Sequence, residues 1–282
     1  MTSLRFKLCL AALLLGLRAG PAGAEVAGMC RFDTEKLQFA GDPDEEARCL
    51  LQKVRRGGEI VPQNVPESIL DLVMGPGGPS LDAQAEAIAM FSEPYRTYAA
   101  AHARDPVSKT EGGFALAYFV IHDTSTPFLG NERFPADLNR DFAVNAFEPY
   151  VAREPVAHIF LNRYGQIWPG HDFAEPWRAT KLETRIVGVP ARGRFVHIEL
   201  VQPRRYAKGS TSRGDTLAPK PGFSREQYRQ LAALYVYVSG RAGRWLIPAF
   251  HATVDAGIPE AHDDPQNFDL KAFAREVARL TR

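Results

Sequence analysis

This sequence of 282 residues has few long apolar runs and few cysteines, and its positive and negative charges almost balance. Beyond residue 24, no stretch is apolar over the roughly 20 residues that a membrane-spanning helix requires, so we expect no integral membrane segment there. The 34 Lys and Arg residues almost balance the 33 Asp and Glu residues. A chain so close to neutrality has no general attraction for nucleic acid, and the basic cluster that begins at Arg204-Arg205 is interpreted as a solvated loop.

The N-terminus has the three parts of a secretory signal peptide. Arg5 and Lys7 form the basic part, an apolar run covers residues 8–17, and small residues end at Ala24. We therefore assign residues 1–24 to a signal peptide and predict a periplasmic or secreted protein. Its removal takes away three basic residues and no acidic one, which leaves 31 basic and 33 acidic residues and a net charge of about −2.

Only three cysteines occur, and Cys9 lies inside the predicted signal peptide. Cys30 and Cys49 remain as an even pair in a compartment where disulfides form. We expect a disulfide between them that closes a loop of about 20 residues and stabilises the fold by about 3 kcal/mol in the loop-entropy model. Two buried free thiols are the alternative.

Residues 25–108 show helix signals and no obvious chemistry. They are expected to form a helical N-terminal region that packs on, or orients, the part of the chain that follows. Capping residues, first-turn acids and apolar residues at helical spacing predict its helices. Three are expected: from Pro43 to Gly57-Gly58, over 66–73, and from 81 to about 101.

From residue 109 to residue 282 the pattern changes to strands that alternate with helices, which is typical of an α/β domain. We expect a mixed central β-sheet flanked by helices. The predicted strands cover 114–122, two segments around a turn within 157–168, 195–202, and an extended run within 245–254. The predicted helices cover 224–239 and 270–280.

Five side chains that can bind a metal or move a proton lie at these strands or in the segment after them. His122 ends the first buried strand, Glu199 lies within another, and His251, His262 and Asp264 come far downstream. Strand ends are where α/β enzymes place reactive groups, because the scaffold there is rigid and loops give access.

The residue types match the needs of a catalytic zinc site. Such a site has three His, Asp, Glu or Cys ligands and one position open to water, whose pKa the metal lowers to about 7. It also needs a carboxylate that relays a proton to the leaving group and a donor that stabilises the oxyanion. The five side chains could fill these roles, although their spacing alone does not establish it.

Four segments carry a resemblance to a known family, in the family's own order. They are 119–124 (FVIHDT), 157–167 (AHIFLNRYGQI), 198–200 (IEL), and His251 with the later 264–268 (DPQNF). Together they resemble the first ligand strand, the strand–turn–strand segment, the catalytic strand and the closing segment of the type-2 N-acetylmuramoyl-L-alanine amidases. These are zinc amidases related to the peptidoglycan recognition proteins. The resemblance covers about residues 114–282.

The resemblance implies that His122, His251 and Asp264 hold Zn2+ and that Glu199 is the catalytic carboxylate. His262 stands where the family usually has lysine, and in its protonated form it would offset charge on the oxyanion. Residues 109–282 would then be a zinc amidase-like catalytic domain. Its substrate would be peptidoglycan or a muropeptide, cut at the amide between N-acetylmuramic acid and L-alanine.

The chain departs from the family's pattern at two further positions. His197 stands where a glycine usually precedes the catalytic glutamate by two positions, and Arg178 follows Trp177 where a histidine is usual. Together with His262, these departures concern substrate recognition and the oxyanion rather than the three ligands.

Each ligand assignment has an ordinary alternative. His122 could be a core histidine at a strand end, and His251 a hydrogen-bonded loop residue. Asp264 could initiate a turn. In that case Asp263 or His262 would be the substitute ligand.

The role of Glu199 and the function of the chain also have alternatives. Glu199 could belong to a structural ion pair, although a carboxylate is costly to bury without a partner. The chain could be a peptidoglycan-binding protein without activity, or a zinc hydrolase of the same fold that acts on another amide.

Overall fold

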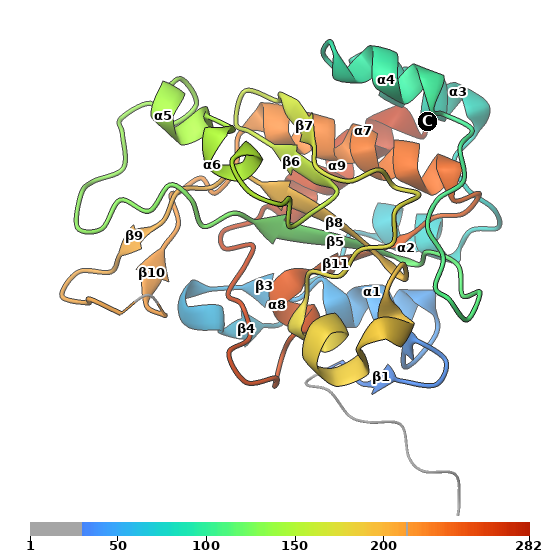
Figure 1. Ribbon diagram of the computed structural model, residues 1–282, viewed down its shortest axis with the longest axis horizontal. Coiled ribbons are helices and arrows are strands. Elements are labelled where there is room, and N and C mark those ends of the chain that lie inside the picture. Colours follow the sequence, from blue (N-terminus) through green and yellow to red (C-terminus); the bar gives the residue numbers. More distant parts are fainter. Residues whose placement is uncertain (1–29, 213) are drawn as a thin grey trace, which may run out of the picture.

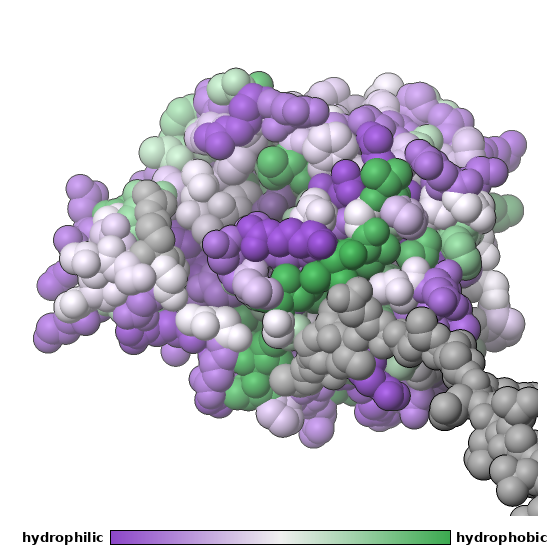
Figure 2. All heavy atoms as spheres, turned by 60° about the horizontal axis from the view of Figure 1, so that its bottom comes forward, coloured by the Kyte–Doolittle hydropathy of each residue, from purple (hydrophilic) through white to green (hydrophobic). Residues whose placement is uncertain are grey.

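A computed structural model describes residues 30–212 and 214–282 (Figure 1). The predicted signal peptide and Cys9 lie outside the described residues. Cys30 and Cys49 form the expected disulfide. None of the helices in the described part of the chain has the length and apolar character needed to cross a bilayer. On the face seen in Figure 2, hydrophilic side chains predominate and hydrophobic ones gather in a narrow central band.

A five-stranded mixed sheet forms the centre of the molecule, which confirms the predicted fold class. Its strands, in spatial order, are β11 (Ile247–Phe250), β5 (Tyr118–Asp123), β8 (Phe195–Leu200), β6 (Ile159–Leu161) and β7 (Ile167–Pro169). The first four run parallel and β7 runs antiparallel to β6. All residues of β5 are buried, as expected for a central parallel strand covered on both faces.

Helices cover both faces of this sheet. Figure 1 shows α7 (Arg225–Arg241) and α9 (Leu270–Leu280) above it, and α1 (Pro43–Leu50) and α8 (His251–Val254) below it. The helices predicted over 224–239 and 270–280 are thus confirmed within two residues. Ser224 caps α7 through a capping box with Gln227, so the signal in the sequence marks its start correctly.

The N-terminal region is less helical than predicted. Helix α1 ends at Leu50 rather than at Gly57-Gly58, and the chain continues as a hairpin of β3 (Lys53–Val54) and β4 (Ile60–Val61). The turn between them needs the positive φ of Gly57 and Gly58, which glycine adopts readily. A second hairpin joins β1 (Phe32–Asp33) to β2 (Gln38–Phe39).

The single helix predicted over 81–101 is in fact two helices, α3 (Leu81–Met90) and α4 (Tyr95–Ala101). Pro94 lies between them. Proline has no backbone N–H to donate and disfavours helical geometry in the residue before it, so one continuous helix cannot form. The short helix α2 (Glu67–Met74) agrees with its prediction.

The remaining elements are short. They are α5 (Phe142–Asn145), α6 (Glu148–Val151), β9 (Arg205–Tyr206), β10 (Thr216–Leu217), the 3₁₀ turns η1 (Arg56–Gly58) and η3 (Val189–Ala191), and the π-helical segment η2 (Leu182–Val187). The segment η2 lies beside β8, where Glu183 Oε2 is 3.2 Å from His197 Nε2.

The N-terminal region shares one hydrophobic core with the sheet. The ring of Phe39 lies 5.3 Å from that of Tyr118, and the ring of Phe32 lies 6.2 Å from that of Phe195. Tyr118 and Phe195 begin β5 and β8, so this region packs at the amino ends of the central strands. The boundary at residues 108 and 109 stays a prediction.

A buried carboxyl joins α1 to the sheet at this amino edge. The hydroxyl of Tyr118 donates to Glu46 Oε2 at 2.6 Å and accepts from the backbone N–H of Phe39 at 2.9 Å. Burial raises the pKa of Glu46 to about 7, against the opposing effects of the Tyr118 hydrogen bond and of the charges of Arg194 and Arg244. Between about pH 4.5 and 7, Glu46 therefore stays protonated in the folded protein, whereas an ordinary carboxyl is ionised.

We predict that Glu46→Gln changes how stability depends on pH. Between about pH 4.5 and 7 the folded wild type keeps a proton that the unfolded chain releases, so its free energy of unfolding falls as pH rises. Glutamine cannot ionise and still offers Tyr118 an acceptor. Urea unfolding should show equal stability near pH 5 and a more stable variant at pH 8. Parallel pH profiles for the two proteins would contradict this.

Candidate metal centre

Strand pairing brings three of the predicted site residues to one edge of the sheet. β5 and β8 are adjacent and parallel, and their register places His122 opposite Glu199. β11 pairs with the other side of β5 and ends at Phe250, so His251 follows directly as the first residue of α8. Because the carboxyl ends of parallel strands lie at the same edge, these three side chains meet there.

Asp264 reaches the same place from the segment that precedes α9. The backbone N–H of Ala252 donates to its carbonyl at 2.8 Å and fixes this segment beside α8. One potential ligand atom from each of His122, His251 and Asp264 lies within 4.8 Å of the others, and all three residues are buried. The structure thus brings together the three residues predicted as ligands, and the cluster could hold a metal ion.

The close contacts all involve the same side of each imidazole ring. His122 Nδ1 lies 2.8 Å from His251 Nδ1, and His251 Nδ1 lies 3.1 Å from Asp264 Oδ1. Two imidazole nitrogens and one carboxylate oxygen are a donor set found in catalytic zinc sites. The Nε2 atom of His251 faces away, 2.9 Å from Asp255 Oδ2. Asp255 thus lies behind the ring of His251, on the side opposite the cluster.

The two histidines of the cluster have pKa values shifted in opposite directions. Burial, together with the neighbouring His251 and His197, holds the pKa of His122 well below its usual value. Burial also opposes a charge on His251, but Asp264 and Asp255 raise its pKa well above normal. Burial also opposes a charge on Asp264, but the neighbouring His251 holds the pKa of its carboxyl well below the ordinary value. Without a metal, the cluster therefore holds a His251–Asp264 ion pair beside a neutral His122.

Glu199 lies next to this cluster with one oxygen unpaired. Its Oε1 lies 4.0 Å from His122 Nδ1, and its Oε2 is buried without a hydrogen-bond partner. Burial and the nearby Asp264 raise the pKa of Glu199 well above the ordinary value. No Lys or Arg of the described residues forms an ion pair with it. The structural ion-pair alternative therefore has no cationic partner for Glu199 among the described residues, since the lowered pKa of His122 keeps that ring uncharged.

His262 stands at the rim rather than inside the cluster. Its side chain is 51% exposed, and its Nδ1 lies 3.6 Å from Asp264 Oδ1. Its ring centre lies 4.4 Å from that of His251. All five predicted site residues are therefore within one small region.

A cavity of about 440 Å³ opens over these residues. Its lining includes His122, Glu199, His251 and His262, with Trp177, Arg178 and Lys181 among the others. A second hollow of about 140 Å³ adjoins it and shares the lining residues Thr124, Val156 and Glu199. Glu199 thus lies where the two hollows meet.

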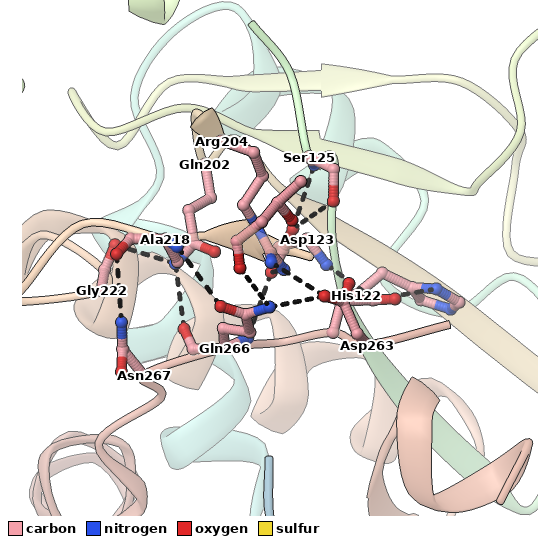
Figure 3. A network of polar contacts seen from close by, with 12 residues as sticks. His122, Asp123, Ser125, Gln202, Arg204, Ala218, Gly222, Asp263, Gln266 and Asn267 are labelled. Atoms are coloured by element: carbon pink, nitrogen blue, oxygen red, sulfur yellow. Dashed lines mark hydrogen bonds and ion pairs between the residues drawn. The ribbon is translucent and has the colours of Figure 1, made fainter. Parts of the chain in front are cut away.

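A buried ion pair behind the cluster was not predicted (Figure 3). Arg204 Nη2 lies 2.6 Å from Asp123 Oδ2, and the backbone N–H of Gln266 donates to the same oxygen at 3.2 Å. The backbone N–H of Asp123 in turn donates to Asp264 Oδ2 at 3.0 Å. The interpretation of Arg204 as part of a solvated loop is therefore wrong, because its side chain is only 1% exposed.

The same network decides between the two neighbouring aspartates. Asp263 Oδ2 lies 3.4 Å from Arg204 Nη1 and accepts from the side chain of Gln266 at 2.5 Å. Asp263 is thereby directed toward the arginine, and Asp264 toward the two histidines. The geometry favours Asp264 over Asp263 as the candidate ligand.

Sequence reasoning missed two further carboxylates near the cluster, Asp255 and Glu183. Asp255 had a usable signal, since it follows His251 by four residues and this spacing brings two side chains together on a helix. Glu183 had none, because only the tertiary fold brings η2 to β8.

No family model matches the chain, and no curated protein is similar to it at a significant level. A solved structure described as a crystal structure of a selenomethionine derivative of AmpD matches with 19% identity and a TM-score of 0.35. The match covers 61% of this chain and 90% of that chain. A likeness of this size carries no argument about function.

We predict that Arg204→Met lowers the free energy of unfolding by about 3–5 kcal/mol, because it leaves Asp123 buried without its partner. Urea unfolding measures this. Lys208→Met, an exposed position four residues later, is the matched control and should cost about 0.5 kcal/mol or less. Equal stability of the two variants would show that the buried pair contributes nothing.

Proposed function

We propose that this protein is a zinc-dependent hydrolase that cleaves the amide between the lactyl group of N-acetylmuramic acid and the first L-alanine of peptidoglycan. One observation carries the proposal: two buried imidazoles and a buried carboxylate have ligand atoms within 4.8 Å of one another, beside Glu199, whose buried Oε2 has no hydrogen-bond partner. The resemblance of the four sequence segments supplies the bond and the substrate. The predicted disulfide supports a periplasmic or secreted location, since such bonds persist there.

In this proposal His122, His251 and Asp264 hold the zinc ion. When bound, zinc would polarise the amide carbonyl and supply a nucleophile that is active near neutral pH. Glu199 moves the proton: its carboxylate takes one from the attacking water and gives it to the departing amide nitrogen. Burial raises the pKa of the Glu199 carboxyl above its ordinary value, and a more basic carboxylate takes a proton from water more readily.

His262 and the cavity rim supply the remaining functions. A protonated imidazole at His262 would donate to the oxyanion that forms on the attacked carbonyl. Arg178 and Lys181 add positive charge to the cavity lining. Stem peptides carry carboxylates, so this rim complements the substrate that we propose.

Purified peptidoglycan, incubated with the protein with and without a chelator, tests the proposal directly. Mass spectrometry should show free stem peptides only without chelator, and added zinc should restore their release. Binding to peptidoglycan with no released fragment would favour the binding-protein alternative. Cleavage at a different amide would identify a zinc hydrolase with another specificity.

We predict that Glu199→Gln lowers the rate of this cleavage by about 10²–10⁴-fold, the range in which positioned general acids and bases contribute. Glutamine keeps the shape of the side chain and cannot carry the proton. The zinc content should equal that of the wild type, because Glu199 is not one of the three proposed ligands. Glu175→Gln, a carboxylate outside the cavity lining, is the control. Activity of Glu199→Gln near the wild-type level would remove Glu199 from the mechanism.

A further inference from the structure

A separate cavity, of about 370 Å³, lies at the opposite edge of the sheet from the metal cluster. Its lining includes Tyr118 and Ile247, the first residues of β5 and β11, whereas the cluster lies at the carboxyl ends of these strands. His122 is four residues beyond Tyr118 in β5, which separates the two sites by roughly 13 Å along the strand. We call this hollow the amino-edge cavity.

Both parts of the chain contribute to the amino-edge cavity. Glu46 of α1 and Val73 of α2 come from the N-terminal region, and Arg194 and Arg244 come from the α/β part. The cavity therefore exists only because the two parts pack together. Its volume lies within the range of about 300–1,000 Å³ that is usual for sites that bind small molecules.

Two arginines of this lining are held in place by backbone carbonyls. Arg194 Nε donates to the carbonyl of Leu37 at 2.7 Å, and its Nη1 donates to the carbonyl of Ala115. Arg244 Nε donates to the carbonyl of Leu116 at 3.1 Å. A guanidinium has five N–H donors, so each arginine keeps several for a further partner.

Neither arginine has an acidic partner in the described part of the chain. No carboxylate oxygen of residues 30–212 and 214–282 lies within 4.0 Å of either guanidinium, and the carbonyl partners carry no charge. Yet Arg194 is only 8% exposed and Arg244 is half-buried. Burial lowers the pKa of each arginine, and the charge of Arg244 lowers the pKa of Arg194 further. Charged groups removed from water are normally paired, so this pair lacks an anion.

Glu46 does not supply that anion, although it is the one acidic residue in the described lining. Its Oε2 accepts from the hydroxyl of Tyr118, and burial raises the pKa of Glu46 to about 7. Below pH 7 its carboxyl is therefore mostly uncharged, and the two arginines determine the charge of the cavity. Guanidinium groups hold carboxylates and phosphates through strong, charge-assisted hydrogen bonds.

Apolar and aromatic side chains complete the lining. Val73, Trp245 and Ile247 belong to it. The position of Trp245 is fixed by its backbone N–H, which donates to the carbonyl of Gly77 at 3.2 Å. A lining that combines apolar surface with a few convergent polar groups is typical of sites for organic molecules, and it suits an organic anion better than a bare inorganic ion.

We propose that the amino-edge cavity is a binding site for a small organic anion, whose carboxylate or phosphate group is held by Arg194 and Arg244 while its apolar part contacts Trp245. This site needs neither zinc nor peptidoglycan cleavage, so it is independent of the proposed function. It gives the N-terminal region a role in binding, because Glu46 and Val73 belong to the lining.

The first measurement follows the indole N–H signals of Trp245 and Trp177 by NMR. Benzoate, phenyl phosphate and the uncharged benzamide are each titrated near pH 6 into ¹⁵N-labelled protein, and a Trp245→Phe variant assigns the signal. Trp177 lines the cavity over the metal cluster, so its signal reports binding there. We expect a saturable shift of the Trp245 signal with at least one of the two anions, equal with and without zinc, and none with benzamide. The anion that binds more tightly identifies the preferred oxyanion group.

Three results of this titration would overturn the proposal. The first is a shift of the Trp177 signal alone, which would place the anion in the other cavity. The second is an equal response of Trp245 to benzamide, which would show that the arginines contribute nothing. The third is the absence of a saturable Trp245 shift up to the solubility limit of both anions.

The second measurement is the affinity for the tighter of the two anions, by isothermal titration calorimetry. Arg194→Gln and Arg244→Gln should each weaken binding by about 10–100-fold, the usual effect of losing a hydrogen bond to a charged group. Arg225→Gln, at an exposed position outside the lining, is the matched control and should bind as the wild type does. Unchanged affinity in both cavity variants would overturn the proposal. If Arg194→Gln does not fold, Arg244→Gln and the Trp245 signal of the wild type still decide.

Discussion

Two parallel strand pairings, β5 with β8 and β5 with β11, determine which side chains meet at the candidate site. They place His122, Glu199 and His251 at a single edge of the sheet, and a one-residue shift in either register would turn these side chains to the other face. The register is well defined because β5 and β11 are buried throughout and each side chain has a matching space in the core. Hydrophobic packing of the strands thus positions polar groups that would not assemble by themselves.

This arrangement buries several charged side chains. Asp123, Arg204, Asp255, Asp264 and Glu183 are all almost fully removed from water. Such groups are tolerated when hydrogen bonds replace the lost water, and here backbone N–H groups supply many of them. The same bonds prevent the side chains around the cluster from rearranging. We therefore regard the local structure as selected for a fixed geometry at the expense of stability.

Much of this architecture could be predicted from the sequence, because long apolar runs and capping residues are local signals. They located the central strands and the helices α7 and α9. The hairpins β1–β2 and β3–β4 escaped detection, since strands of two residues have no periodicity. The burial of Arg204 and the contact of Glu183 with His197 depend on segments distant in the chain, and no local pattern encodes them. Motif resemblance identified the five site residues, whose roles stay predictions.

X-ray absorption spectroscopy at the zinc edge, on the zinc-loaded full chain, tests the central claim most directly. The account predicts one zinc ion per chain with two imidazole nitrogens and at least one carboxylate oxygen, at distances of about 2.0–2.2 Å. His122→Ala, His251→Ala and Asp264→Ala should each abolish this signal, whereas Asp263→Ala should keep it. A protein that binds no zinc, or that binds it unchanged in all three ligand variants, would contradict the account.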